Sequence, residues 1–171
     1  MTSTITQWGR QQAAEYRGGT DRPLGGYAAL LGIYGSVVAG TAVVGRLARR
    51  RIPDRFSAGD IVLLTVATHR LSRTIAKDPV TSPLRAPFTR FKGPGAGEEI
   101  EETVRGHGVQ HSVGELLGCP MCLAQWCATA IAAGLVIAPR PTRLAMVTLS
   151  AVAGADFLQY GYALLQKVTE G

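Results

Sequence analysis

The chain has 171 residues, which is enough for one domain. Its net charge is +6, but the arginines cluster beside apolar runs, which is typical of juxtamembrane segments and disfavours nucleic-acid binding. Three cysteines, an odd number, disfavour a secreted scaffold built on a closed set of disulfides.

Residues 1–23 are predicted to be a polar N-terminal tail, and residues 24–171 a single helical membrane domain. The first apolar run starts too late and is too long for a signal peptide. It covers Leu24–Val44 without a charged residue, a length of 21 positions that suffices to cross a bilayer. Small residues recur at every fourth position of this run and predict a ridge on which a second helix packs. They are Ala28, Gly32, Ser36 and Gly40.

Five arginines follow the first apolar run and predict a cytoplasmic loop. They are Arg46, Arg49, Arg50, Arg51 and Arg55. The next hydrophobic stretch, Ala58–Ala76, is predicted to begin at an N-cap formed by Ser57, with Asp60 in the first turn. Its uncharged centre is short, and basic residues follow on one face, which favours an interfacial or re-entrant helix. A complete crossing, giving four spans in total, is the alternative.

Residues 78–111 are predicted to form a Pro/Gly-rich cytoplasmic linker, because four prolines exclude a long helix. Its basic residues favour the cytoplasmic side. An acidic run at 98–102 is predicted to be a solvated face that pairs with the basic loops, and a cation site is the alternative.

Two more spans are predicted after the linker. Ser112 and Glu115 match a capping box that starts a short helix, and the Gly118-Cys-Pro120 sequence interrupts it. A spanning helix then covers Pro120–Ala138, and a last one runs from Pro141 or Thr142 to about Gln166. The predicted fold is therefore an all-α, small polytopic membrane helix bundle, with three spans and one interfacial or re-entrant helix.

Cys119 and Cys122 are the residues that most resemble a chemical site. A thiol at a helix N-terminus has a lowered pKa, so this pair could be a redox dithiol. Together with His107 and His111 it could also bind zinc, because tetrahedral zinc accepts two imidazoles and two thiolates. The alternative is that the cysteines pack between helices and that the histidines are loop residues.

Asp156 and Gln159 are polar positions in the predicted last span. A carboxylate inside a membrane is costly unless it is paired, and the predicted partners of Asp156 are His69, Arg70 or Arg73. A structural ion pair is the leading interpretation. A proton or ion relay that uses Asp156 is the alternative.

Two segments resemble a known bacterial membrane family. One runs from His69 to Phe88 and contains Arg-Leu-Ser-Arg, Asp-Pro and Pro-Leu-Arg-Ala-Pro; the other is Glu-Leu-Leu-Gly-Cys-Pro-Met-Cys-Leu-Ala-Gln-Trp at 115–126. Both are similar to domain of unknown function 1360, over roughly residues 58–165. The resemblance implies a small membrane protein of Gram-positive bacteria without a known activity. Its motif residues here are Arg70, Arg73, Asp78, Arg85, Cys119, Cys122 and Trp126.

We therefore expect a structural or protein-interaction component of the bacterial cytoplasmic membrane that passes the membrane several times. Neither an enzyme nor a small-molecule substrate is indicated, and no cofactor is expected apart from the zinc alternative. The expected partners are membrane lipid and another membrane protein or a second copy of the chain.

Overall fold

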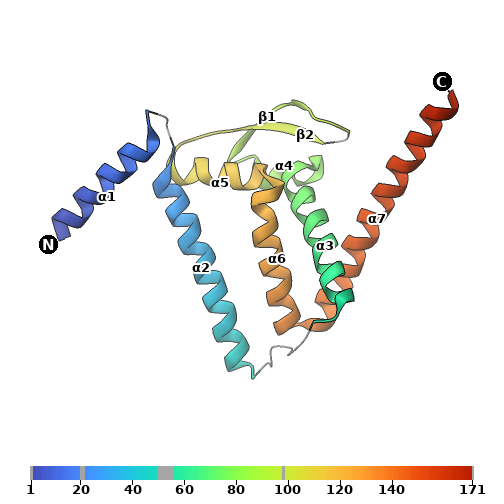
Figure 1. Cartoon of the computed structure of the whole chain (residues 1–171), viewed down its shortest axis with the longest axis horizontal. Helices are drawn as coiled ribbons and strands as arrows, with labels where there is room; N and C mark the ends of the chain where they lie inside the picture. Colours follow the sequence, from blue (N-terminus) through green and yellow to red (C-terminus); the bar gives the residue numbers. More distant parts are fainter. Residues whose placement is uncertain (1, 20–21, 50–55, 98, 171) are drawn as a thin grey trace.

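The computed structural model describes residues 2–19, 22–49, 56–97 and 99–170 (Figure 1). The long helices are α1 (Thr2–Arg17), α2 (Leu24–Leu47), α3 (Ala58–Lys77), α5 (Gly108–Gly118), α6 (Pro120–Ile137) and α7 (Pro139–Glu170). Two short helical turns, η1 (Pro79–Thr81) and α4 (Ser82–Arg85), precede the strands β1 (Thr89–Pro94) and β2 (Ile100–Val104).

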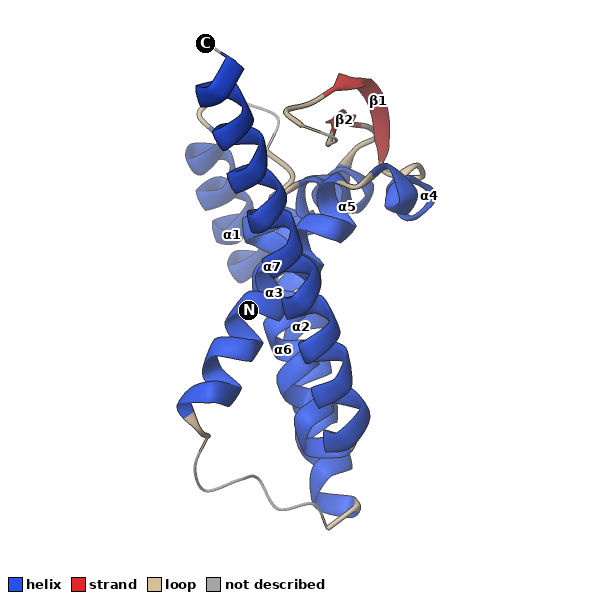
Figure 2. Cartoon of the chain, turned by 90° about the vertical axis from the view of Figure 1, so that its right-hand side faces the viewer, coloured by secondary structure: helices blue, strands red, loops and turns tan. Residues whose placement is uncertain are grey.

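Four helices run up and down through one bundle. α2 and α6 run away from the end of the molecule where the strands lie, whereas α3 and α7 run towards it (Figure 1). We call residues 78–118, which hold η1, α4, β1, β2 and α5, the cap. It lies at one end of the bundle in both views (Figures 1 and 2). The opposite end of the bundle holds the end of α2, the start of α3, the end of α6 and the start of α7 (Figure 1).

The hydrophobic core lies between α3, α6 and α7. Its buried members are Ala67, Ile131, Leu135 and Met146, and Leu63, Leu64, Leu71 and Leu149 pack around them. Gly134 allows α6 and α7 to approach each other, because a Cβ added there would lie 2.7 Å from the Thr142 hydroxyl oxygen. The bundle is thus built on three closely packed helices.

α2 packs mainly against α5 and, to a smaller extent, against α6. A Cβ on Gly26 would lie 2.7 Å from the carbonyl oxygen of Gly108, so α2 and α5 are in close contact there. The predicted small-residue ridge of α2 is exposed instead, and nothing lies near a Cβ added to Gly32 or Gly40. The prediction that a second helix packs on this ridge is not met within the described chain.

α3 begins and ends as local sequence predicts, but its place in the fold differs. The Ser57 side chain accepts a hydrogen bond from the Asp60 backbone N–H, and the reciprocal bond completes a capping box. α3 then packs lengthwise against α6 and α7 (Figure 2). Such a position does not fit a helix that lies apart from the bundle on the membrane surface.

Two helices in the described part of the chain, α2 and α6, are long and apolar enough to cross a membrane. The prediction of three spans is not supported, since α7 is not among them. α7 is 32 residues long, but Asp156, Gln159, Gln166 and Lys167 make its second half polar on one side. Length and composition alone therefore support two spans.

The segment predicted to be a linker contains an antiparallel hairpin, so the fold is mostly helical and not all-α. β1 pairs with β2 from Thr89 opposite Val104 to Pro94 opposite Ile100, with a bulge between Phe91 and Gly93. The prolines do prevent a long helix here. β1 was not predicted, because its six residues include only one β-branched side chain and therefore give a weak strand signal.

The predicted capping box at Ser112 is wrong. α5 begins four residues earlier, at Gly108, so Ser112 lies inside the helix. Its hydroxyl donates to the Gly108 carbonyl at 3.2 Å, and the Pro23 carbonyl lies at 3.5 Å. The side chain thus joins α5 to the start of α2 and does not cap its own helix.

Candidate functional site

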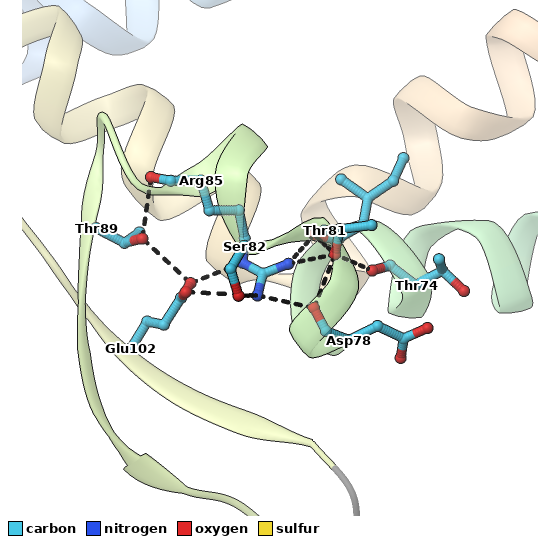
Figure 3. A network of polar contacts seen from close by, with 8 residues as sticks. Thr74, Asp78, Thr81, Ser82, Arg85, Thr89 and Glu102 are labelled. Carbon is cyan, nitrogen blue, oxygen red and sulfur yellow. Dashed lines mark hydrogen bonds and ion pairs between the residues drawn. The ribbon is translucent and has the colours of Figure 1, made fainter.

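Arg85 lies at the centre of a buried polar network where the cap meets α3 (Figure 3). Its side chain is 0% exposed, and its Nε donates to Glu102 at 2.7 Å. One terminal nitrogen donates to the Ile75 carbonyl at 2.5 Å and to the Thr81 hydroxyl at 2.6 Å. The other donates to the Asp78 carbonyl at 3.1 Å. The planar guanidinium thus satisfies four acceptors at once.

This network ends α3 and fixes the hairpin to it. The carbonyls in the last turn of a helix lack partners within that helix. The Thr81 hydroxyl donates to the Thr74 carbonyl at 2.6 Å, and the Arg85 guanidinium donates to the Ile75 carbonyl. On the other side, the Thr89 hydroxyl lies 3.1 Å from the Glu102 carboxylate, so both strands contribute to the same cluster. The arrangement positions the cap on the bundle.

Arg70, on α3, forms two ion pairs. It lies 3.3 Å from Asp78, at the end of α3, and 3.2 Å from Asp156 on α7. Asp156 is therefore paired with one of the three partners that the sequence suggested. Gln159, the other polar residue expected in the last span, is exposed on α7.

The acidic run pairs with basic residues of the same end. Arg73 on α3 forms an ion pair with Glu99, and Lys92 on β1 lies 3.3 Å from Glu101 on β2. With Arg85 and Glu102, each described glutamate of the run has a cationic partner. Glu98 lies outside the described residues. This use of the carboxylates favours pairing over a cation site.

Cys119 and Cys122 form a disulfide at the joint between α5 and α6. Their Cα atoms are 5.3 Å apart. Cys119 is the N-cap of α6, and its sulfur accepts a hydrogen bond from the Cys122 backbone N–H at 3.1 Å. Pro120 occupies the first helical position, as predicted. Cys127 is buried in α6 and is not part of this bond.

The four proposed zinc ligands are not assembled. Among the described residues, no group of three or more His, Cys, Asp or Glu side chains could hold a metal ion. His107 is the N-cap of α5, and His111 lies 3.6 Å from Glu115 on the same helix. Since Cys119 and Cys122 bond to each other, the arrangement gives the zinc interpretation no support.

Tyrosines of α2 form polar contacts that the sequence did not reveal. Tyr34 Oη lies 2.8 Å from the Thr129 hydroxyl and accepts from Gln125 at 2.7 Å, and its ring packs edge-on against Trp126 at 5.2 Å. The polar pair at 125 and 129, one turn apart in an apolar helix, was the signal that could have predicted this contact.

A second tyrosine anchors the cap end of α2. Tyr27 donates to the Glu115 carboxylate at 2.5 Å. Its hydroxyl also hydrogen-bonds Arg22, just before the helix, and thereby raises the pKa of that guanidinium. The family motif residue Trp126 and the motif glutamate at 115 thus both contact α2.

Comparison with known proteins identifies the family of this chain. The family described as "Protein of unknown function (DUF1360)" has a model that matches residues 63–162. The chain belongs to this family. The match confirms the resemblance drawn from the two motif segments, and it contains most of α3, the cap, α6 and α7 up to residue 162.

Two relatives come from Bacillus subtilis (strain 168). The chain is 34% identical over 97 residues to "Sporulation protein YjcA", which covers 55% of this chain and 81% of the relative. It is 31% identical over 108 residues to "UPF0713 protein YngL", which covers 60% of this chain and 77% of the relative. No solved structure matches. Both relatives are bacterial, and neither of their names states a chemical activity.

Proposed function

We propose that this chain is a multi-pass protein of the bacterial cytoplasmic membrane and serves there as a structural or protein-interaction component. The observation that carries the proposal is the exposure of α2. Only 6% of the most apolar 18-residue stretch of this helix is buried, although the helix has no charged residue before Arg46. In a soluble protein, such a helix would be the buried core, because exposed apolar area is costly in water.

α7 supports the proposal through its exposed apolar side chains. Asp156 of this helix pairs with Arg70, and the Tyr160 hydroxyl lies 3.3 Å from a Cβ added to Gly97 in the hairpin turn. Its apolar side chains are 64–80% exposed, namely Phe157, Leu158, Leu164, Leu165 and Val168. Exposed apolar side chains in such number are typical of a surface that contacts lipid or another apolar helix.

Four helices then enter the membrane in this proposal, in place of three and one interfacial helix. α3 lies between α6 and α7, and its charge at Arg70 is neutralised by Asp78 and Asp156. Neutralisation inside the protein removes most of the cost of placing an arginine at membrane depth. The ion pairs therefore allow α3 and α7 to accompany the two apolar helices.

An interaction role is favoured over catalysis, because the polar residues near the cap form ion pairs within the protein. The described carboxylates around the cap have cationic partners, and these pairs hold secondary-structure elements together. The exposed small-residue ridge of α2 offers a surface for close helix contact. We expect another membrane protein or a second copy there.

Membrane fractionation tests the proposal. The full chain is expected to stay in the membrane pellet after washing at high pH and to be released by detergent. Val37→Lys with Val38→Lys, at the centre of α2, should reduce the amount in the pellet because two charges must then enter the bilayer core. Arg49→Lys is the matched control and should stay in the pellet. Recovery of the wild-type chain in the soluble fraction would refute the proposal.

A further inference from the structure

The end of the bundle opposite the cap carries an uncompensated positive charge. We call this the basic end; its described arginines are Arg46 and Arg49, at the end of α2, and Arg140 and Arg143, at the start of α7. Arg143 pairs with Asp60 at 3.3 Å, and Asp60 is the one carboxylate of this end in the described ranges. Arg46, Arg49 and Arg140 are exposed and have no ion pair with any described residue.

The cap end differs, because its carboxylates balance its cations: the described residues between 78 and 118 hold five carboxylates and four cations. Arg70, Arg73, Arg85 and Lys92 each form an ion pair, whereas Lys77, Arg90 and Arg105 form none with a described residue. The described residues therefore separate net charge along the bundle axis, with cations and carboxylates nearly balanced at the cap end and an excess of arginine at the other. Arginines that flank apolar helices and lack protein partners are suited to the anionic headgroups of the cytoplasmic leaflet.

The disulfide is a second, independent indication of orientation. Cys119 and Cys122 lie at the cap-end terminus of α6, and their bond closes the joint below the cap. Disulfides persist in oxidising compartments and are rare where thiols are kept reduced. The disulfide therefore favours the outer face of the membrane for the cap, which leaves the basic end on the inner face.

We propose that the basic end contacts anionic phospholipid headgroups of the cytoplasmic leaflet, and that the cap with its disulfide lies on the outer face. This inference rests on the membrane location proposed above. It differs from the sequence-based expectation that the stretch starting at Arg46 and the segment 78–111 share the cytoplasm. α3 separates the two, since it starts at the basic end and finishes at the cap.

Thiol labelling in spheroplasts tests the orientation. Single cysteines replace Glu101 in the cap or Arg140 at the basic end, in a chain with the three native cysteines changed to serine. A membrane-impermeant maleimide should label Glu101→Cys in intact spheroplasts and Arg140→Cys only after permeabilisation. Reversed labelling, or equal labelling of both sites in a membrane-retained chain, would overturn the inference alone. A chain found in the soluble fraction would overturn the proposed function with it.

The lipid contact is tested in reconstituted vesicles. The full chain should show a higher thermal unfolding midpoint in phosphatidylcholine mixed with phosphatidylglycerol than in phosphatidylcholine alone. Arg46→Glu, Arg49→Glu and Arg140→Glu together should abolish this shift and lower Glu101→Cys labelling in spheroplasts by about tenfold. The cap variant, Arg90→Glu with Arg105→Glu, changes two exposed side chains without an ion pair and should keep both. Equal effects of the two variants would refute a specific role of the basic end.

The native cysteines provide a measurement that does not depend on variants. Intact cells are treated with an alkylating reagent before lysis, and the chain is then analysed by mass spectrometry. Cys119 and Cys122 are expected to be alkylated only after a reductant has been added. Direct alkylation of both in untreated cells would overturn the placement of the cap on the oxidising side.

Discussion

Arg85 and Glu102 form a buried ion pair at 2.7 Å, with side chains 0% and 9% exposed. Arg85 ends the short helix α4, and Glu102 lies on β2, so the pair joins two elements that are 17 residues apart. Because Arg85 also caps the last turn of α3 through the Ile75 carbonyl, the pair connects the hairpin with the bundle. A buried pair of this kind is costly to break, since removing one partner leaves the other charged and unsolvated.

Arg85→Ala is therefore expected to lower the free energy of unfolding by about 3–5 kcal/mol, measured in detergent by thermal or denaturant unfolding. Arg85→Lys should recover only part of the loss, because an ammonium group cannot reproduce the planar set of donors. Arg90→Ala, an exposed neighbour on β1, is the control and should change little. An unchanged stability of Arg85→Ala would contradict the structural role of this pair.

The ion pair between Arg70 and Asp156 should couple α3 to α7. In a double-mutant cycle with Arg70→Ala and Asp156→Ala, we expect a coupling energy of about 1 kcal/mol. We place it at the low end because Asp156 is 37% exposed and Arg70 keeps Asp78 as a second partner. Gln159→Ala, on the same helix, is the control for local helix effects. Additive losses in the cycle would show that the two residues do not interact.

Gly26 is expected to tolerate no side chain. A Cβ there would lie 2.7 Å from the Gly108 carbonyl oxygen and closer still to the Ser112 hydroxyl, so α2 or α5 would have to shift. We expect Gly26→Val to destabilise the fold by about 1–3 kcal/mol, as overpacking usually does. Gly32→Val on the same helix has open space around it and serves as the control. Equal thermal midpoints of the two variants would mean that α2 does not pack on α5.

Gly114 provides the corresponding test for the contact between α5 and the hairpin. A Cβ at Gly114 would lie 2.6 Å from the Phe88 carbonyl oxygen and 2.6 Å from a Val104 methyl group. Gly114→Ala should loosen the cap and increase proteolytic cleavage within residues 86–106 severalfold. Gly118→Ala, which meets nothing within 4 Å, should be cleaved like the wild type. Equal cleavage of all three chains would argue against close packing here.

Local sequence chemistry predicted much of the helical framework. The N-cap at Ser57, the apolar run from Leu24 and the break before Pro120 all lie where the sequence indicated, because caps, apolar composition and proline act over a few residues. The last helix starts at Pro139 and ends at Glu170, beyond both predicted limits. A proline in the first helical turn loses no hydrogen bond, so it was a poor marker of that start.

The sequence by itself determined the apolar helices α2 and α6, a cysteine pair at a helix start and family motifs around Arg70 and Arg85. Only the tertiary structure decided what these features do. It placed Arg85 against Glu102, Arg70 against Asp156 and Tyr34 against Trp126, and it separated the basic end from the cap. Such pairings join residues from different helices and strands, so they depend on how whole elements pack, which a local pattern does not encode.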